Sequence, residues 1–310
     1  MSYIMEEGEI KKGLNIYLYY WTIVFSIGFL VIDTLAKDVK INFQNFNISL
    51  MISVVSFLFG FLITISFSML LSRTAALRES LATETGRLIS IYLLSKHLGE
   101  KFHKSVEDKI DEYTIRTLRD YTNYKVGREI IYQINDDLKL VELENNHQQS
   151  IYGSLLYILG ELEPTREKLE SLTKGKLLWS LKLSNYLLGI ILIVLLFLNR
   201  GDRFSNILFI LLSTIVVFIL LIIEDYDNLK IGTYNMNIND SEQIFDLIGR
   251  ERYYPEKVLK MAELEKGKVY RIGIYDSKEK SEKIVRLKYT PYFEVRLNKI
   301  IKGFSKKELE

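Results

Sequence analysis

The sequence predicts an all-α membrane protein with four transmembrane helices in two hairpins, long cytoplasmic helices and a small C-terminal β-hairpin. Three observations lead to this prediction. The 310-residue chain contains four long uncharged runs, charged residues still make up 26% of it, and only three prolines interrupt it. Hydrophobicity that is clustered in this way, with few helix breakers between the clusters, is typical of an integral membrane protein with large parts outside the bilayer.

The first uncharged run covers residues 14–32, which at 1.5 Å per residue is long enough to cross a bilayer core of about 30 Å. It does not resemble a signal peptide, because a mixed acidic and basic segment precedes it and no small-residue cleavage site follows. The other three runs cover residues 48–71, 183–198 and 204–223. Short connections at residues 33–47 and 199–203 join the four spans into two hairpins.

These spans divide the chain into four segments. Residues 1–71 hold an N-terminal segment and the first two spans, and residues 72–182 form a cytoplasmic helical region. Residues 183–223 hold the third and fourth spans, and residues 224–310 form a cytoplasmic C-terminal region with two helices and the β-hairpin.

Basic residues near the spans predict the orientation in the membrane. Three arginines follow the second span and five basic residues precede the third, whereas the two short loops together hold four. The first group comprises Arg73, Arg78, Arg87, Arg166, Lys168, Lys174, Lys176 and Lys182, and the second comprises Lys37, Lys40, Arg200 and Arg203. By the positive-inside rule, the middle region and both termini lie in the cytoplasm of a protein of the cell membrane.

The middle region reads as a series of amphipathic helices. Residues 75–102 carry apolar positions at helical spacing, namely Leu77, Leu81, Leu88, Tyr92 and Leu98. In the next helix Ser105 is the expected N-cap, and the apolar seam consists of Val106, Ile110, Tyr113, Thr117 and Tyr121. Further helices are expected at residues 125–140, 150–162 and 164–173, with Pro164 at the first position of the last one.

The C-terminal region mixes helices with a hairpin. The Asn-rich residues 234–240 are expected to be irregular, and a helix is expected from Ser241 to about Gly249. Pro255 is expected to open a second helix that ends near Gly267. Residues 269–275 and 284–289 alternate like strands and predict a β-hairpin, the only sheet expected.

Composition and motifs exclude several classes of function. The 41 basic and 39 acidic residues leave a net charge of +2, which argues against a nucleic-acid partner. The absence of cysteine excludes disulfides, thiolate metal sites and thiol catalysis. The sequence also lacks the glycine-rich phosphate-binding and nucleophile-elbow motifs. We therefore expect neither enzymatic activity nor a bound cofactor, with calcium as the one candidate ion.

The second span carries a stripe of small and polar residues at spacings of 3, 4, 4 and 4, which places them on one helix face. The stripe consists of Ser53, Ser56, Gly60, Thr64 and Ser68. Such a face is typical either of a pore lining or of close helix packing, and the residues alone leave both interpretations open. Phe57, Phe59 and Phe61 alternate with the stripe and suggest a hydrophobic constriction.

An acidic cluster follows the fourth span. Glu224, Asp225 and Asp227 offer the oxygen ligands that hard cations prefer, although the spacing of a calcium-binding EF-hand is missing. The alternative is an interfacial patch that pairs with Arg73 or Arg78. Apart from Lys182 at one edge, the spans themselves contain no ionisable residue. This argues against a proton-coupled transporter and leaves a channel open.

Three stretches carry a resemblance to a known family. They are SFLFGFLITISFSMLLSR at residues 56–73, RESLATETGRLISIYLL at residues 78–94 and IEDYDNLKIGTYNMNINDSEQIF at residues 223–245. Together with the order of spans, they resemble the bestrophin channels, and more closely the prokaryotic and plant relatives that form the bestrophin-like domain family.

The resemblance implies a homo-pentamer in which five copies of the second span surround a pore. It favours pore-facing roles for Ser56, Gly60 and Thr64, with Phe57 and Phe61 near a neck. Together with the rest of the stripe, the candidate pore-lining residues are Ser53, Ser56, Phe57, Gly60, Phe61, Thr64 and Ser68. The chain departs from the family at Asn228 and Leu229, where a Pro-Phe pair is usual, and Gly232 is displaced. The acidic run that forms the calcium clasp of animal bestrophins is thinned here, which argues against calcium gating.

The sequence thus predicts an oligomeric ion channel whose partners are the lipid bilayer, other copies of the chain and inorganic ions. Whether the ions are anions or cations stays open. The alternative is a non-conducting, membrane-anchored interaction or sensory module. It is favoured by the large share of residues outside the spans and by the hairpin, which the resemblance does not explain.

Overall fold

The computed structural model describes residues 16–36, 47–119, 127–229, 233–256, 259, 262, 264–276 and 281–293. The chain folds into two compact units, each built from two separate stretches of sequence. The membrane unit comprises Met1–Ala75 and Gly175–Gly232, and the second unit comprises Ala76–Lys174 and Thr233–Glu310. The basic residues Lys37 and Lys40 and the seam residue Tyr121 lie outside the described residues.

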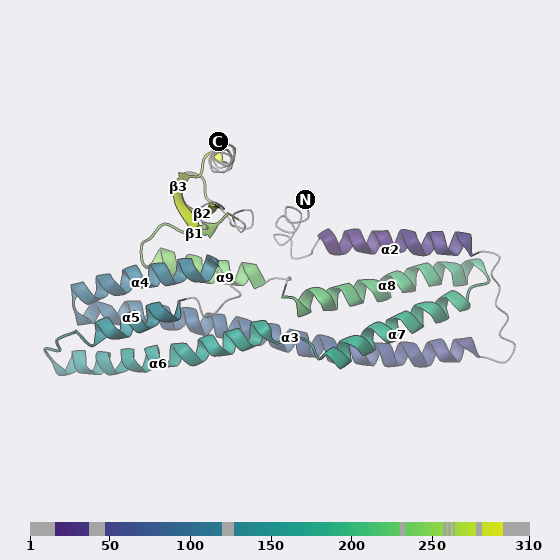
Figure 1. Ribbon diagram of the computed structural model, residues 1–310, viewed down its shortest axis with the longest axis horizontal. Coiled ribbons are helices and arrows are strands. Elements are labelled where there is room, and N and C mark those ends of the chain that lie inside the picture. The colour runs from purple at the N-terminus through teal and green to yellow at the C-terminus, as the bar shows by residue number, and fades with distance from the viewer. Residues whose placement is uncertain are drawn as a thin grey trace. The chain divides into compact units, whose positions relative to one another are not determined.

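Four long apolar helices confirm the predicted spans (Figure 1). They are α2 (Ile16–Leu35), the first part of α3 (Ile48–Ser95), α7 (Trp179–Leu198) and α8 (Arg203–Asp227). Each is long and apolar enough to cross a membrane. Helix α3 continues without interruption past the predicted end of the second span, because the amphipathic pattern after residue 72 contains no proline.

In the membrane unit, α8 packs against both α2 and α7 (Figure 1). The buried core includes Phe29, Phe59, Leu192, Phe209 and Val216. The rings of Phe29 and Phe209 meet edge to face with their centroids 5.8 Å apart, a favourable aromatic geometry.

One buried ion pair closes an end of this unit. The guanidinium of Arg200 lies 3.1 Å from the carboxylate of Asp33 and 3.7 Å from the ring centroid of Phe197. The pair joins the end of α2 to the turn between α7 and α8. Both side chains are largely buried, where a lone charge would be costly, and the pairing supplies the compensation.

The second unit holds the rest of α3, the 3₁₀ helix η2 (Lys96–Leu98), α4 (Glu100–Arg119), α5 (Arg128–Leu138), α6 (Asn146–Lys174) and α9 (Thr233–Leu247). The five inward positions predicted for residues 75–102 are all buried, each with at most 7% exposure. Three residues of the predicted α4 seam, Val106, Ile110 and Tyr113, are likewise at most 1% exposed. Helical periodicity in the sequence therefore identified the core of this unit correctly.

A three-stranded sheet completes the second unit. It consists of β1 (Tyr253–Pro255), β2 (Val269–Asp276) and β3 (Ser281–Lys288) in that order. Strands β2 and β3 pair antiparallel, with Val269 opposite Lys288, which confirms the predicted hairpin. Strand β1 pairs parallel to β2, so the hairpin is not the only sheet element.

The predicted helix that opens at Pro255 is wrong at its first residue, because Pro255 ends β1. Tyr253 and Tyr254 are almost completely buried, and burying both rings favours the extended chain. Proline is tolerated there because β1 is an edge strand with one side of its backbone unpaired. Much of the remaining predicted helix, including residues 257, 258, 260, 261 and 263, lies outside the described residues.

Residues 234–240 were expected to be irregular, but they belong to α9. Asparagine is a weak helix former, and here tertiary packing outweighs that propensity. Ile238, Ser241, Ile244 and Phe245 recur at helical spacing and are all buried. The buried stripe, rather than the composition, determines the helix.

Ser105 is not a helix N-cap, because α4 begins five residues earlier at Glu100. Its hydroxyl instead donates to the carboxylate of Asp137 in α5. Pro164 does not start a helix either, because it lies inside the single long helix α6. A proline ring clashes with the carbonyl four residues earlier, and here that residue is Gly160, which has no side chain to add to the crowding.

Candidate functional site

The stripe on α3 faces away from the rest of the protomer. Within the membrane unit α3 packs through Phe59, Ile63, Ser66 and Leu70, all of which are buried. The stripe residues Ser53, Ser56, Gly60, Thr64 and Ser68 are all exposed. A Cβ built on Gly60 would have no atom within 4 Å. The small residues therefore do not serve close packing among the described helices of this chain.

Two hydroxyls of the stripe are bonded to their own helix. Thr64 Oγ1 donates to the carbonyl of Gly60 at 2.8 Å, and Ser53 Oγ donates to the carbonyl of Ser49 at 3.0 Å. This back-bonding satisfies the hydroxyl hydrogens inside an apolar span and leaves the oxygen lone pairs facing outward. At these two positions the face can therefore offer oxygen lone pairs to ions or water without leaving an unpaired donor when it is dry.

The exposed surface of α3 has two flanks. Phe57 and Phe61 lie at the edge of the stripe and are 73% and 57% exposed. At about 100° per residue, Val54, Leu58 and Met69 lie farther round, and all three are apolar and exposed. Phe59 was grouped with the other two phenylalanines in the sequence, but it is buried in the core. The flank with Val54, Leu58 and Met69 is thus suited to contact lipid, whereas the stripe is small and polar.

The acidic cluster at the end of α8 is held by cations of the same unit. Asp227 is 1% exposed; its Oδ1 accepts from the backbone N–H of Leu177 at 2.7 Å, and its Oδ2 accepts from Lys182 Nζ at 3.1 Å. Arg73 donates to the backbone carbonyl of Asp227 at 3.0 Å and lies 3.7 Å from its carboxylate. The side chain of Asp227 therefore joins α3, α7 and α8.

Glu224 makes a similar set of contacts. Its carboxylate lies 2.6 Å from Lys182 Nζ and accepts hydrogen bonds from Tyr186 and Asn228, both at 2.9 Å. Asp225, between the two, is 7% exposed. The oxygens of Glu224 and Asp227 are thus occupied by protein donors.

The predicted pairing of this cluster with Arg73 is present. Among the residues that the structure describes, no group of three or more histidine or acidic side chains is arranged to hold a metal ion. These contacts are those of the ion-pair interpretation that the sequence left open.

The second unit contains a buried polar network. Arg166 in α6 is 2% exposed, and its Nη1 lies 2.6 Å from Oε1 of Glu84 in α3. The hydroxyl of Tyr113 in α4 contacts both groups. Burial raises the pKa of Tyr113 well above its usual value of about 10, and the Glu84 carboxylate raises it further. The tyrosine therefore stays protonated and bridges three helices.

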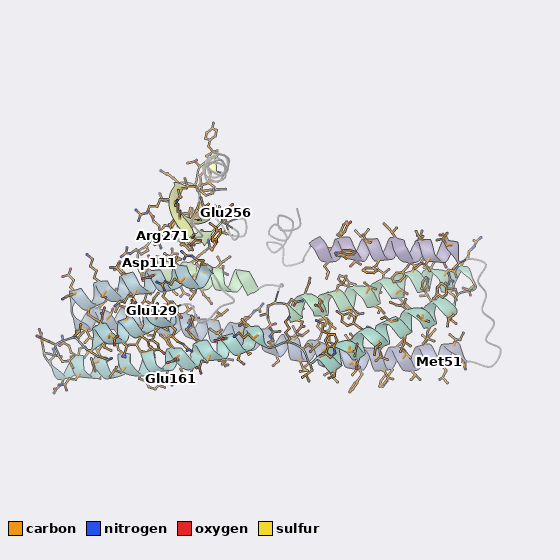
Figure 2. All side chains as sticks on the ribbon, in the orientation of Figure 1. Met51, Asp111, Glu129, Glu161, Glu256 and Arg271 are labelled. Atoms are coloured by element: carbon orange, nitrogen blue, oxygen red, sulfur yellow. The ribbon has the colours of Figure 1, made fainter. Side chains whose placement is uncertain are left out.

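The C-terminal sheet is fastened to α4 by arginines. Both Nη atoms of Arg271 in β2 lie 2.6 Å from the two carboxylate oxygens of Asp111, a bidentate pair; Figure 2 labels both residues. Arg250 pairs with Glu107 and Asp108 of the same helix at 2.7 and 2.6 Å. Helix α4 and the sheet are thus held together by charge.

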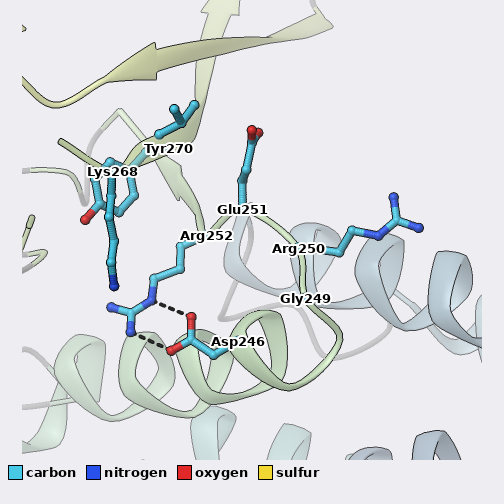
Figure 3. Close-up of a pocket in the computed structure, with 8 residues that line it drawn as sticks. Asp246, Gly249, Arg250, Glu251, Arg252, Lys268 and Tyr270 are labelled. Atoms are coloured by element: carbon cyan, nitrogen blue, oxygen red, sulfur yellow. Dashed lines mark hydrogen bonds and ion pairs between the residues drawn. The ribbon is translucent and has the colours of Figure 1, made fainter.

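A cavity of about 440 Å³ lies between the end of α9 and strand β2 (Figure 3). Arg252 and Lys268 both line it, together with Asp246. Arg252 donates to both carboxylate oxygens of Asp246, at 2.9 and 2.6 Å, and Lys268 pairs with Glu265 at 2.7 Å. Because the cations already have carboxylate partners, the cavity offers little to an anionic ligand.

One buried polar residue of the membrane unit, Asn185, was not predicted from the sequence. Asn185 in α7 is 1% exposed, and its Nδ2 donates to Ser66 Oγ of α3 at 2.6 Å. The signal that could have found it is simple, because Asn185 is the one amide side chain within residues 183–198. A polar side chain inside a span usually contacts another helix.

The fold and the α3 face together define an integral membrane protein with four spans, whose longest helix presents a small and polar face to the outside of the protomer. Residues 20–236 match the bestrophin-like domain. The chain therefore belongs to the bestrophin-like domain family, as the three sequence stretches suggested. Membership in this family also confirms that the protein is not an enzyme.

Solved structures share the fold. The crystal structure of a point variant of a bacterial bestrophin homologue from Klebsiella pneumoniae is 12% identical, with a TM-score of 0.57, and the match covers 76% of this chain and 99% of that chain. A crystal structure of another membrane protein variant is 13% identical, with a TM-score of 0.55, and covers 76% of this chain and 98% of that one. No curated protein matches this sequence.

The matched region ends at residue 236. Most of α9 and the whole three-stranded sheet therefore lie beyond the family domain. Their contacts with α4 show that this addition is integrated into the second unit.

Proposed function

We propose that this protein is an oligomeric ion channel in which α3 lines the pore. The observation that carries the proposal is the position of the stripe, which is small, polar and exposed on a helix whose opposite face is buried in the protomer. Membership in the bestrophin-like family supports the same function.

The stripe favours an assembly of several copies. One helix per protomer cannot enclose a pore, so several copies of α3 must face a common axis. Closed rings of identical subunits are the usual way in which proteins build such an axis. We propose five copies, as the resemblance to bestrophins implies, with Phe57 and Phe61 at the narrowest part.

The chemistry of the proposed pore is that of a hydroxyl-lined path with a hydrophobic neck. Ser53, Ser56, Thr64 and Ser68 present oxygen lone pairs, and Gly60 exposes its backbone. Phenylalanine rings that project into such a path can gate it by dewetting. The pore-lining set that we propose is therefore the same one that the sequence suggested.

The orientation is proposed from charge. Basic residues are more frequent in the segments that adjoin the second and third spans than in the two short loops, so by the positive-inside rule we propose that the second unit and both termini lie in the cytoplasm. For the acidic cluster of Glu224, Asp225 and Asp227 we propose a structural role at the end of α8, because Lys182 and Arg73 occupy its oxygens. The proposal includes no calcium dependence.

The test uses cysteine accessibility, for which the chain is well suited because it contains no cysteine. Single variants Ser56→Cys, Thr64→Cys and Ser68→Cys are reconstituted in liposomes, and ion flux is measured before and after a charged, membrane-impermeant thiol reagent. We expect modification to reduce flux by at least tenfold at these positions.

The matched control is Leu58→Cys, which lies on the apolar flank of the same helix and is 44% exposed in the protomer. It should react at least tenfold more slowly and leave flux unchanged. Flux that is insensitive to modification at all three stripe positions would contradict a pore along α3.

A second candidate is the non-conducting interaction module, which one observation favours: the C-terminal sheet lies beyond the family domain. Under this alternative the reconstituted protein shows no flux, and a detergent-corrected mass corresponds to one or two chains. A mass near five chains together with measurable flux supports the channel.

A further inference from the structure

The side of α3 that faces the protomer makes a fully buried polar contact with the neighbouring span α7. Asn185 Nδ2 in α7 donates to Ser66 Oγ at 2.6 Å, and the two residues are 1% and 0% exposed. The hydroxyl of Ser66 uses its own hydrogen to bond the carbonyl of Leu62 at 2.9 Å. Ser66 Oγ must therefore accept from Asn185, which fixes the orientation of the amide.

Gly189, one turn after Asn185 on α7, is closely packed. A Cβ on Gly189 would lie 3.0 Å from Leu220 and 3.3 Å from Val216 of α8, and 3.4 Å from Phe59 of α3. Helix α7 therefore contacts α3 at two points, Phe59 and Ser66, which are seven residues or two turns apart on one face. These contacts resist rotation of α3 about its own axis.

One polar atom of the Asn185 side chain takes no part in this contact. Among the described residues, Asn185 Oδ1 has no hydrogen-bond partner although the side chain is buried. A buried polar atom without a partner destabilises a membrane bundle, so an apolar residue would be at least as stable here. A buried asparagine that specifies how helices align at the expense of stability is known from coiled coils.

We infer that Asn185 is a positioning residue whose hydrogen bond to Ser66 fixes the rotational setting of α3, and so determines which face of α3 lines the pore. The inference rests on the proposed channel function. Ser66 lies two residues after Thr64, so their side chains point about 160° apart around the helix. Holding Ser66 toward α7 therefore holds Thr64 away from it, toward the pore axis.

The test measures the face of α3 directly. In the full-length protein in liposomes, single cysteines at Thr64 and at Leu58 are modified with a membrane-impermeant thiol reagent, and the ratio of the two rates is taken. The ratio is then measured again with Asn185→Leu, which removes the amide at similar volume, and with Ser66→Ala, which removes the acceptor. We expect a ratio of at least tenfold in the parent and of threefold or less in both variants.

Thermal stability separates positioning from a merely structural role. We expect Asn185→Leu to unfold at the same temperature as the parent or a higher one while the rate ratio collapses. The matched control is Ser213→Ala, which also removes a fully buried hydroxyl. Unlike that of Ser66, the hydroxyl of Ser213 has no hydrogen-bond partner among the described residues, so its removal should leave the ratio of modification rates unchanged. The exchanged pair Asn185→Ser with Ser66→Asn restores a hydrogen bond between the same helices and should restore the ratio.

The outcomes are distinguishable. A tenfold ratio that persists in Asn185→Leu overturns the positioning role and leaves the proposed pore intact. A collapsed ratio that accompanies a lower unfolding temperature in both variants also overturns it, because loss of packing then suffices. A parent in which Thr64 and Leu58 react alike refutes the pore face itself.

Discussion

Replacing Arg166 by methionine is the most informative perturbation of the second unit. Arg166 is 2% exposed and forms the ion pair with Glu84, whose side chain is 9% exposed. The substitution keeps most of the side-chain volume and removes the charge. It leaves the Glu84 carboxylate buried without its cation, and among the described residues the hydroxyl of Tyr113 remains as its hydrogen-bond partner.

The expected magnitude follows from this geometry. Removing one partner of a buried ion pair typically costs about 3–5 kcal/mol, because the remaining charge is uncompensated. Replacing both partners by neutral groups of similar volume is often close to neutral. The double variant Arg166→Met with Glu84→Gln should therefore recover most of the lost stability.

The assay is pulse proteolysis of the full-length protein in detergent across a urea series, following cleavage within the second unit. With a urea dependence of about 2 kcal/mol per molar for a unit of this size, the single variant should shift the midpoint down by about 1.5–2.5 M. The double variant should lie within about 0.7 M of the parent.

Two results would refute the reasoning. A single variant within 0.5 M of the parent would mean that Arg166 and Glu84 are not a buried pair. A double variant as unstable as the single one would mean that Arg166 acts through packing rather than through charge. Arg116→Met is the matched control, because its pair with Glu112 is exposed and should change the midpoint little.

Three further predictions concern other parts of the chain. Gly189→Leu should destabilise the membrane unit by about 1–3 kcal/mol through overpacking. Gly28→Leu should not, because a Cβ at residue 28 meets nothing within 4 Å. After heating, Gly28→Leu should still elute as a single species in size-exclusion chromatography, and Gly189→Leu should not. Burial, and to a lesser extent a neighbouring carboxylate, raises the pKa of Asp240, so the folded state binds the proton of this carboxyl group more tightly than the unfolded state does. Stability therefore falls as the pH rises through the raised pKa, and Asp240→Asn should stabilise the second unit at pH 7. A loss of stability in this variant at pH 7 would contradict the reasoning. The hydrogen bond from Arg252 lowers the pKa of Asp246. The contribution of the ionised Asp246 to folding stability is therefore present above the ordinary pKa of about 4 and is lost as the pH falls below it. The melting temperature of Asp246→Asn should approach that of the parent at acidic pH, and a difference that stays constant with pH would refute the assignment.

The spans and the core of the second unit could be predicted because each depends on a simple physical rule. Uncharged runs such as residues 204–223 identify a span by length alone. The periodicity that includes Leu77, Leu81 and Leu88 identifies a buried helix face. The stripe on α3 was recognised from its spacing in the same way, but whether it faced a neighbouring helix or the outside depended on tertiary packing.

The errors arose where local signals conflict with long-range packing. Asparagines at residues 234–240 favour an irregular chain, yet Ile238, Ile244 and Phe245 bury one face of a helix. Pro255 is a good helix opener, yet β1 finds its partner about 18 residues later in β2. Strand pairing over such a separation leaves no local trace in a three-residue segment.

Asn185 shows a third kind of limit. Its presence in an apolar span is visible in the sequence, but its partner lies 119 residues earlier in the chain. From sequence alone an intramembrane asparagine could face a pore, a neighbouring copy or a helix of its own protomer. Only the packed bundle shows that it bonds Ser66.

The two faces of α3 have different roles: the buried face stabilises the protomer, and the exposed stripe is the face for which we propose a role in conduction. The buried face, with Phe59, Ile63 and Leu70, supports the protomer, whereas the residues of the stripe are exposed. Substitutions along the stripe should therefore leave the isolated protomer intact and act only on assembly and conduction. A helix that uses one face to fold and leaves a small, polar face exposed within a membrane-spanning segment is the pattern that the proposed assembly explains, because apolar lipid offers the hydroxyl oxygens of that face no hydrogen-bond partner. In the assembly that we propose, those faces meet water, and this connects the sequence pattern at residues 53–68 to the proposed channel.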